Sequence, residues 1–271
     1  MRVSIIAPFW PCPLEKALEE MCRAGYKYIE LRLRGADKTS DEDVRHIKNL
    51  FEDMDLKMVA VLWMAEFSLG DPDAEKRRIS VQQWKNAIRT TKKLGCNLLT
   101  PELGGNPLYR TECAKAFKKS AEELSPILEK EEITIAFEPH PGDFIQESNE
   151  TVDLIRETGC GNIGYLYCTP HTFVLGGSDA SSMIRYAGDT LKHVHVADTH
   201  KADRIIAPPT VRAHEHLIPG EGEIRFEEIF QTLKEIGYES FLSVKIYSHQ
   251  DKPIEAAMES KKRLEKLMSD L

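Results

Sequence analysis

Histidine is distributed very unevenly along this chain. Of the nine histidines, only His46 precedes residue 140. The later ones are His140, His171, His193, His195, His200, His214, His216 and His249. Imidazole is a common metal ligand and carries protons near neutral pH. Any single one could be a hydrogen-bonded structural residue, but their concentration indicates that metal binding or proton transfer takes place in the second half of the chain.

Two segments place such groups at the ends of apolar runs. Glu138 closes the run 133–138, and His193 and His195 stand two residues apart in the run 193–197. A lone carboxylate is costly to bury, so Glu138 needs a cation, either a metal ion or, as the structural alternative, a Lys or Arg side chain. Residues i and i+2 of a strand share a face, and we expect both rings to point inward, because outward burial against a helix would leave two polar rings unused.

A mixed set of imidazoles and carboxylates favours particular metals. Mn, Zn, Co or Fe(II) accept such ligands, whereas Mg and Ca prefer oxygen alone. The spacing of these residues is unlike that of a compact structural zinc motif, so the fold has to assemble the site. We therefore expect one divalent metal ion, whose identity the sequence leaves open.

Short runs rich in β-branched and aromatic residues alternate with longer stretches of helical apolar spacing. The predicted strands are Val3–Pro8, Tyr28–Leu33, Lys57–Trp63, Asn97–Leu103, Ile133–Glu138, Ile163–Tyr167, His193–Ala197 and Leu242–Tyr247. The predicted helices are Leu14–Arg23, Asp43–Met54, Ala74–Leu94, Thr111–Lys130, Glu150–Thr158, Ala180–Ala187, Phe226–Ile236 and Ile254–Met268. This order predicts an α/β protein that is a single (β/α)8 TIM barrel, with one domain spanning residues 1–271.

An open nucleotide-binding sheet is a poorer fit. It would show a GxGxxG turn after its first strand, but residues 8–13 read Pro-Phe-Trp-Pro-Cys-Pro. In a closed barrel the active site lies at the carboxyl ends of the strands. That rule places His140 and His171 just past the fifth and sixth strands, and His214 and His216 in the long loop after the seventh.

Composition limits the possible partners. The net charge of −8 disfavours nucleic acid, whose binding proteins usually carry a basic stripe. No apolar run approaches the roughly 18 residues of a membrane span, and the start of the chain lacks the pattern of a signal peptide, so a cytoplasmic protein is expected. The six cysteines show no CxxC pair and are expected to be free, mostly buried thiols.

Several motifs together resemble a known family. They are Glu-Pro-His at 138–140, Cys-Thr-Pro-His at 168–171, His-Val-His-Val-Ala-Asp at 193–198 and Pro-Gly-Glu-Gly-Glu at 219–223. The chain resembles the xylose-isomerase-like TIM-barrel superfamily, which includes sugar isomerases and epimerases, and within it is most similar to the IolH group of inositol-catabolism proteins. The resemblance implies that Glu138 and His195 are metal ligands and that His171 is a ligand or a substrate contact.

Two positions depart from the family pattern. Isomerases of this group usually carry Asp where Cys168 stands and a second Glu near Lys245. Cys168 is either a soft ligand, a substrate contact or a spectator thiol, and Lys245 is either a catalytic or anchoring amine or an ion-pair partner. The metal set expected here is therefore Glu138, His171, His195 and His216.

With the second Glu missing, proton transfer is expected to fall to a histidine. His140, His193 and Lys245 are the predicted catalytic residues. The predicted substrate contacts are Cys168, Asp198, His214 and Glu102.

The resemblance implies a metal-dependent isomerase, epimerase or lyase that removes a proton beside the carbonyl of a keto-sugar or inositol-derived ketone. One alternative is a non-catalytic or accessory barrel that binds a polyol. Another is a subunit that cleaves C–C bonds in oxidised C-glycosides, and a third is an endonuclease IV-like nuclease, which the charge disfavours. A sugar or cyclitol is the expected small-molecule partner, and a homo-oligomer is possible for barrels of this kind.

Overall fold

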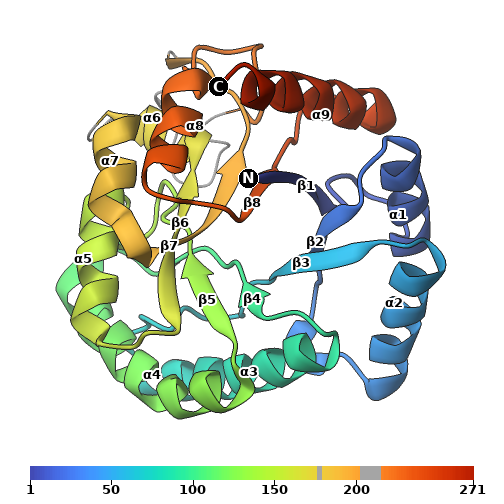
Figure 1. Ribbon diagram of the computed structural model, residues 1–271. Helices are drawn as coiled ribbons and strands as arrows, with labels where there is room; N and C mark the ends of the chain where they lie inside the picture. Colours follow the sequence, from blue (N-terminus) through green and yellow to red (C-terminus); the bar gives the residue numbers. More distant parts are fainter. Residues whose placement is uncertain (176–178, 202–214) are drawn as a thin grey trace.

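Eight parallel strands close into a barrel in which each strand pairs with its neighbours in chain order and β8 returns to β1 (Figure 1). The computed structural model describes residues 1–175, 179–201 and 215–271. The strands are β1 (Arg2–Ala7), β2 (Tyr28–Arg32), β3 (Lys57–Leu62), β4 (Leu98–Leu99), β5 (Thr134–Phe137), β6 (Ile163–Cys168), β7 (Leu191–Val196) and β8 (Phe241–Val244). The predicted (β/α)8 barrel is confirmed.

The helices form an outer ring around the strands (Figure 1). They are α1 (Leu14–Arg23), α2 (Asp41–Asp53), α3 (Ala74–Lys93), α4 (Arg110–Glu131), α5 (Ser148–Thr158), α6 (Thr169–Leu175), α7 (Ala180–Ala187), α8 (Phe226–Glu235) and α9 (Pro253–Ser269). The sequence analysis does not predict α6, because its seven residues are too few for an apolar helical period to stand out. Each of the other helices begins and ends within two residues of its predicted bounds.

The strand predicted at 97–103 is much shorter in the structure. β4 covers only two residues, because Pro101 has no N–H to donate to the ladder. Parallel pairing resumes at an isolated bridge between Glu102 and Glu138. Two carboxylate residues therefore leave neighbouring strands side by side.

Aromatic packing fixes the outer helices against this part of the barrel. The ring of Trp84 in α3 lies 4.9 Å from the ring of Trp63 and 5.9 Å from that of Phe137. Phe117 in α4 meets the other edge of Phe137 at 5.1 Å. Such ring pairs contribute about 0.5–1.5 kcal/mol each beyond their burial. The residue after Phe137 is Glu138, so this packing also holds the end of β5.

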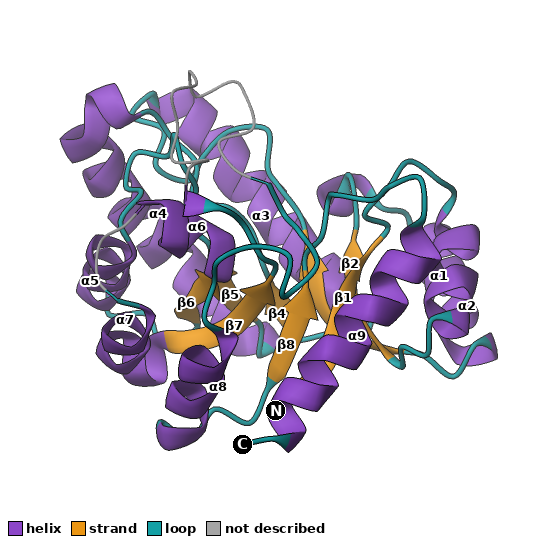
Figure 2. Cartoon of the chain, turned by 90° about the horizontal axis from the view of Figure 1, so that it is seen from above, coloured by secondary structure: helices purple, strands orange, loops and turns teal. Residues whose placement is uncertain are grey.

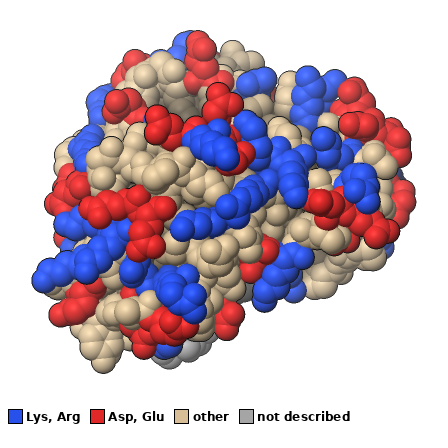
Figure 3. All heavy atoms as spheres, turned by 90° about the horizontal axis from the view of Figure 1, so that it is seen from below, with Lys and Arg blue, Asp and Glu red and all other residues tan. Residues whose placement is uncertain are grey.

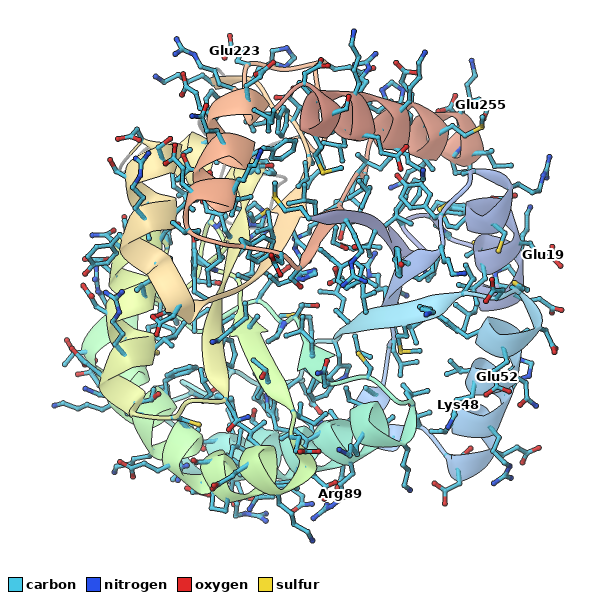
Figure 4. All side chains as sticks on the ribbon, viewed as in Figure 1. Glu19, Lys48, Glu52, Arg89, Glu223 and Glu255 are labelled. Carbon is cyan, nitrogen blue, oxygen red and sulfur yellow. The ribbon has the colours of Figure 1, made fainter. Side chains whose placement is uncertain are left out.

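The surface is polar and mixed in charge. The labelled side chains of Glu19, Lys48, Glu52 and Arg89 point away from the barrel (Figure 4). Positive and negative side chains are interspersed over the face drawn in Figure 3. Among the described residues, no helix has the length and apolarity needed to cross a membrane. All six cysteines lie in the described ranges and are free, as predicted.

The parallel strands run side by side through the centre of the molecule, so their carboxyl ends meet at one end of the barrel (Figure 2). Glu30 in β2 and His195 in β7 lie inside the barrel, and Glu138 and Lys245 follow the last residues of β5 and β8. The fold thus brings together residues more than two hundred positions apart.

Candidate active site

The cation that balances Glu138 is Lys245. The ammonium Nζ lies 2.8 Å from Oε1 and 2.7 Å from Oε2 of the carboxylate. Glu138 is 0% exposed and Lys245 is 3% exposed. The ion pair set out from the sequence as the structural alternative is therefore the contact that forms, and it occupies both carboxylate oxygens.

A second buried carboxylate, Glu30, lies deeper in the barrel. It accepts hydrogen bonds from Nε2 of His193 at 2.9 Å and from Nε2 of His195 at 2.9 Å. Thr100 donates a third at 2.5 Å. Both rings point inward, as the alternation along the strand predicts. Sequence reasoning missed Glu30, although the argument applied to Glu138, a carboxylate within an apolar strand, would have found it.

His195 bridges the two carboxylates. Its Nε2 faces Glu30, and its Nδ1 lies 3.1 Å from Oε1 of Glu138. Burial lowers the pKa of His195, but the two carboxylates outweigh burial and the pKa is raised overall. The imidazolium form is therefore favoured.

Each buried carboxylate of this centre is held ionised by its neighbours. Burial raises the pKa of Glu138, yet Lys245, His171 and His195 hold it well below its usual range. The pKa of Glu30 is likewise held well below its usual range, by His195 and His193 against the effect of burial. Burial lowers the pKa of Lys245, but the charge of Glu138 outweighs burial and the pKa is raised overall, so the amine stays protonated. Two carboxylates thus face one ammonium and an imidazole whose pKa is raised.

A sulfur and nitrogen group lies beside this centre. Cys168 ends β6, and His171 follows in the first turn of α6. Pro170 is tolerated there because a first-turn residue needs no N–H partner within the helix. Nδ1 of His171 lies 3.4 Å from Oε1 of Glu138, and the ring of His216 packs edge-on against His171 at 5.4 Å.

These side chains meet a geometric requirement for metal binding. Cys168, His171 and His216 offer ligand atoms that all lie within 4.8 Å of one another. Glu138, Cys168 and His195 form a second such group, and Glu30, His193 and His195 form a third. Thiolate and imidazole donors suit zinc and related ions. Cys168 belongs to two of these three groups, so the donor set fits an ion on the Cys168 side.

The surroundings of the Cys168 thiol favour its neutral form, although Lys245 acts in the opposite direction. Burial raises its pKa well above the ordinary value, and Glu138 raises it further. A metal ligand must lose this proton, so ion binding at Cys168 releases a proton.

Tyr247 connects the site to a cavity. Its ring lies 4.9 Å from the ring of His216 and 5.7 Å from the guanidinium carbon of Arg32. The cavity measures about 640 Å³, within the range of small-molecule sites. It is lined by Pro8, Phe9, Trp10, Pro11, Cys12, Leu14, Leu31, Arg32, Leu33, Arg34, Glu102, Tyr247 and Gln250.

The predicted catalytic and substrate-contact residues lie in different parts of the site. Glu102 lines the cavity, and Cys168 lies in the metal-donor groups. His140 is half-buried, with its ring 4.5 Å from His171 and its Nδ1 2.8 Å from the carbonyl of Pro141. His193 is fully enclosed in the barrel and does not line the cavity. The predicted contact His214 lies outside the described residues.

Asp198 binds backbone N–H groups of the segment that follows β7. One of its oxygens accepts the N–H groups of Thr199 at 2.8 Å and Ile224 at 3.1 Å, and the other accepts that of Gly220 at 2.8 Å. The side chain is fully buried. Its carboxylate ties the segment before α8 to the end of β7. The substrate contact expected of Asp198 stays a prediction.

The sequence profile described as Xylose isomerase-like TIM barrel matches residues 18–267. This chain belongs to the xylose isomerase-like TIM-barrel family. The family predicted from the motifs at 138–140, 168–171 and 193–198 is therefore confirmed.

Two relatives similar to this chain are named for inosose as their substrate. An inosose dehydratase of Clostridium perfringens is 25% identical over 269 residues, which cover 92% of this chain and 88% of that protein. An inosose isomerase of Bacillus velezensis is 25% identical over 240 residues, covering 86% of this chain and 83% of that protein.

Solved structures show the same barrel. The IolI protein with a bound zinc atom superposes with a TM-score of 0.81 at 21% identity, covering 100% of this chain and 99% of that one. A D-tagatose 3-epimerase-like protein gives 0.82 at 19% identity, covering 99% and 97%. A divalent metal is thus present in at least one barrel of this fold, and the donor groups described above are compatible with one here.

Proposed function

We propose that this protein is an isomerase, epimerase or lyase that removes a proton beside the carbonyl of a keto-sugar or an inositol-derived ketone. The observation that carries the proposal is the buried Glu138–Lys245 pair, set next to a Cys168, His171 and His216 donor group at the carboxyl end of the barrel. The names of the relatives, inosose dehydratase and inosose isomerase, support the substrate class.

The residues of the chain suggest how the charge would be handled. Lys245 is held protonated by Glu138 and presents an ammonium in a site from which water is largely excluded. Such a cation stabilises the negative oxygen that develops when a proton leaves the neighbouring carbon. Glu102 lines the cavity, makes no ion pair among the described residues, and is the carboxylate placed to accept that proton.

A divalent ion held by Cys168, His171 and His216 would add Lewis-acid polarisation of the carbonyl. Lys245 keeps its contact with Glu138 in this arrangement. The metal set predicted from the sequence therefore shifts in the proposal: Cys168 joins it, and Glu138 and His195 become neighbours of the ion that balance its charge.

The accessory polyol-binding barrel is the second candidate. It is favoured by one observation, that Lys245 satisfies both oxygens of Glu138 and so leaves the family's usual carboxylate without a coordinating role. Such a protein would bind a polyol in the cavity and leave it unchanged.

A product screen separates the two candidates. Purified protein is incubated with a panel of inososes and six-carbon ketoses, and products are identified by proton NMR. If the protein is an enzyme, at least one ketone should give an isomerised, epimerised or dehydrated product. The rate of product formation should fall by at least about 100-fold in Glu102→Gln, because the general base is lost. Binding without any product across the panel would favour the accessory barrel.

A further inference from the structure

The cavity beside the site carries two arginines for which the described part of the chain supplies no acidic partner. Arg32 and Arg34 both line it. Among the described residues neither forms an ion pair, whereas Arg77 is paired with Glu123 at 2.6 Å on the outer surface. Arg32 is half-buried and Arg34 is exposed. For the half-buried guanidinium of Arg32 the lack of a carboxylate partner is unusual, because its charge is then neither neutralised by an acidic group nor fully hydrated.

The strand geometry directs Arg32 into the mouth of the barrel. Glu30 and Arg32 stand at i and i+2 of β2 and share a face. The side chain of Glu30 lies inside the barrel on His193 and His195. Arg32 is one step nearer the carboxyl end on the same face, so it opens into the cavity above the buried network.

The rest of the cavity lining suits a polyol with a charged substituent. Its charged side chains are Arg32, Arg34 and Glu102, a formal excess of one positive charge in a chain of net charge −8. Phe9 and Trp10 supply an apolar wall, with their rings 4.6 Å apart edge to face. A locally positive, partly apolar cleft concentrates anionic ligands.

We propose that Arg32 and Arg34 bind an anionic group, a phosphate or a carboxylate, carried by the ketone on which the site acts. Guanidinium groups recognise both anions through paired N–H donors. The ring of Tyr247 lies 5.7 Å from the guanidinium carbon of Arg32 and 4.9 Å from the ring of His216, so an anion on Arg32 would lie near the donor group that includes His216. This inference rests on the proposed function for the identity of the reacting group.

The test compares three matched ketoses: D-fructose, D-fructose 6-phosphate and 2-keto-D-gluconate. Dissociation constants are measured by calorimetry for the unmodified protein, for Arg32→Gln and Arg34→Gln, and for Arg89→Gln as an exposed control on α3. We expect one or both charged ketoses to bind at least about 10-fold more tightly than fructose, because fructose lacks the anionic group that would make the charge-assisted contact. That preference should fall to about 2-fold in Arg32→Gln and stay intact in Arg89→Gln. The ketose that shows the preference tells phosphate from carboxylate.

Equal binding of all three ketoses, or no measurable binding of either charged one, would overturn the inference. An equal loss of neutral and charged ligands in Arg32→Gln would overturn it as well, because the arginine would then have only a structural role. Proton exchange of each ketose with solvent is followed in parallel. An anion preference without exchange would leave the inference standing and remove the proposed function, and exchange of neutral ketones without the preference would do the reverse.

Discussion

At the scale of single residues, the site is organised by charge compensation. Glu138 and Glu30 are enclosed in the barrel, and each is matched by a cation or an imidazole: Lys245 and His195 on one, His195 and His193 on the other. Buried carboxylates persist only when they are paired in this way. Each of these side chains therefore depends on its partner, and the free energy of unfolding of single and double variants measures this dependence.

Removing one member of the buried pair should be far more damaging than removing both. Lys245→Met removes the ammonium and leaves the buried charge of Glu138 with the imidazoles of His195 and His171, and we expect the free energy of unfolding to fall by about 3–5 kcal/mol. The double variant Glu138→Gln/Lys245→Met should recover much of that loss. Urea unfolding measures both. The exposed pair of Lys27 and Asp55 supplies the control, and Lys27→Met should change little. A loss in Lys245→Met no larger than in Lys27→Met would contradict the account.

Asp143 should make the fold less stable as pH rises. Burial, helped by the nearby Glu102, raises its pKa from the ordinary 3.8 to about 8. The unfolded chain therefore releases this proton at lower pH than the folded one, and stability is lost between about pH 4 and 8, by up to about 1.4 kcal/mol per pH unit. Asp143→Asn removes the titrating group.

Urea unfolding at pH 5 and pH 8 tests this expectation. The free energy of unfolding of Asp143→Asn, relative to that of the unmodified protein, should be higher at pH 8 than at pH 5. Asp53→Asn, at an exposed position, is the control and should show no such difference between the two pH values. If Asp143→Asn changes the free energy of unfolding by the same amount at both pH values, Asp143 is ionised in the folded protein and the expectation is wrong.

At the scale of elements, the segment between β7 and α8 is held by Asp198. Its carboxylate accepts three backbone N–H groups, and Gly222 packs directly on Asp198 and on the carbonyl of Thr199. A Cβ at Gly222 would overlap both atoms. This close packing fixes the chain that leads from His216 toward α8.

Gly222→Ala should therefore destabilise the protein, by about 1–3 kcal/mol as for other overpacked sites. Gly161→Ala is the matched control, since a Cβ there meets nothing within 4 Å. The midpoints of thermal unfolding of the two variants are compared with that of the unmodified protein. Equal midpoints for both variants would mean that the segment rearranges freely and that Asp198 does not anchor it.

Elements show why sequence reasoning found some site residues and missed others. Periodicity located the strands, and the parallel barrel then dictated that Glu138 and His195 meet. It missed α6, which is too short to show a period, and so did not foresee that His171 lies on a helix that begins directly after Cys168. The pairing of Lys245 with Glu138 joins residues 107 positions apart, and only the closed barrel determines such a distance.

At the scale of the whole molecule, the barrel encloses a network of paired charges and opens into a cavity of about 640 Å³. The wide cavity and its arginines could not be read from the sequence, because Pro8, Arg32, Glu102 and Gln250 come from four different strand ends. Fold and family followed from patterns along the chain. The cavity is set by side chains that converge only in space.

Metal content is the first whole-molecule prediction. Elemental analysis of purified protein should find about one zinc-type ion per chain, as in other three-ligand sites. The double variant Cys168→Ala/His171→Ala should lose it, whereas Cys160→Ala, at a buried cysteine outside the donor groups, should keep it. An ion retained in the double variant would place the metal elsewhere.

The central claim is that this site removes a carbon-bound proton next to a carbonyl, assisted by a divalent ion. It is tested most directly by the rate at which an inosose exchanges its proton for deuterium in heavy water, followed by NMR before and after chelation of the protein. The account predicts exchange well above the protein-free rate, a fall of at least about 100-fold on chelation, and recovery when zinc or manganese is returned. Exchange at the protein-free rate with the metal-loaded protein would contradict it.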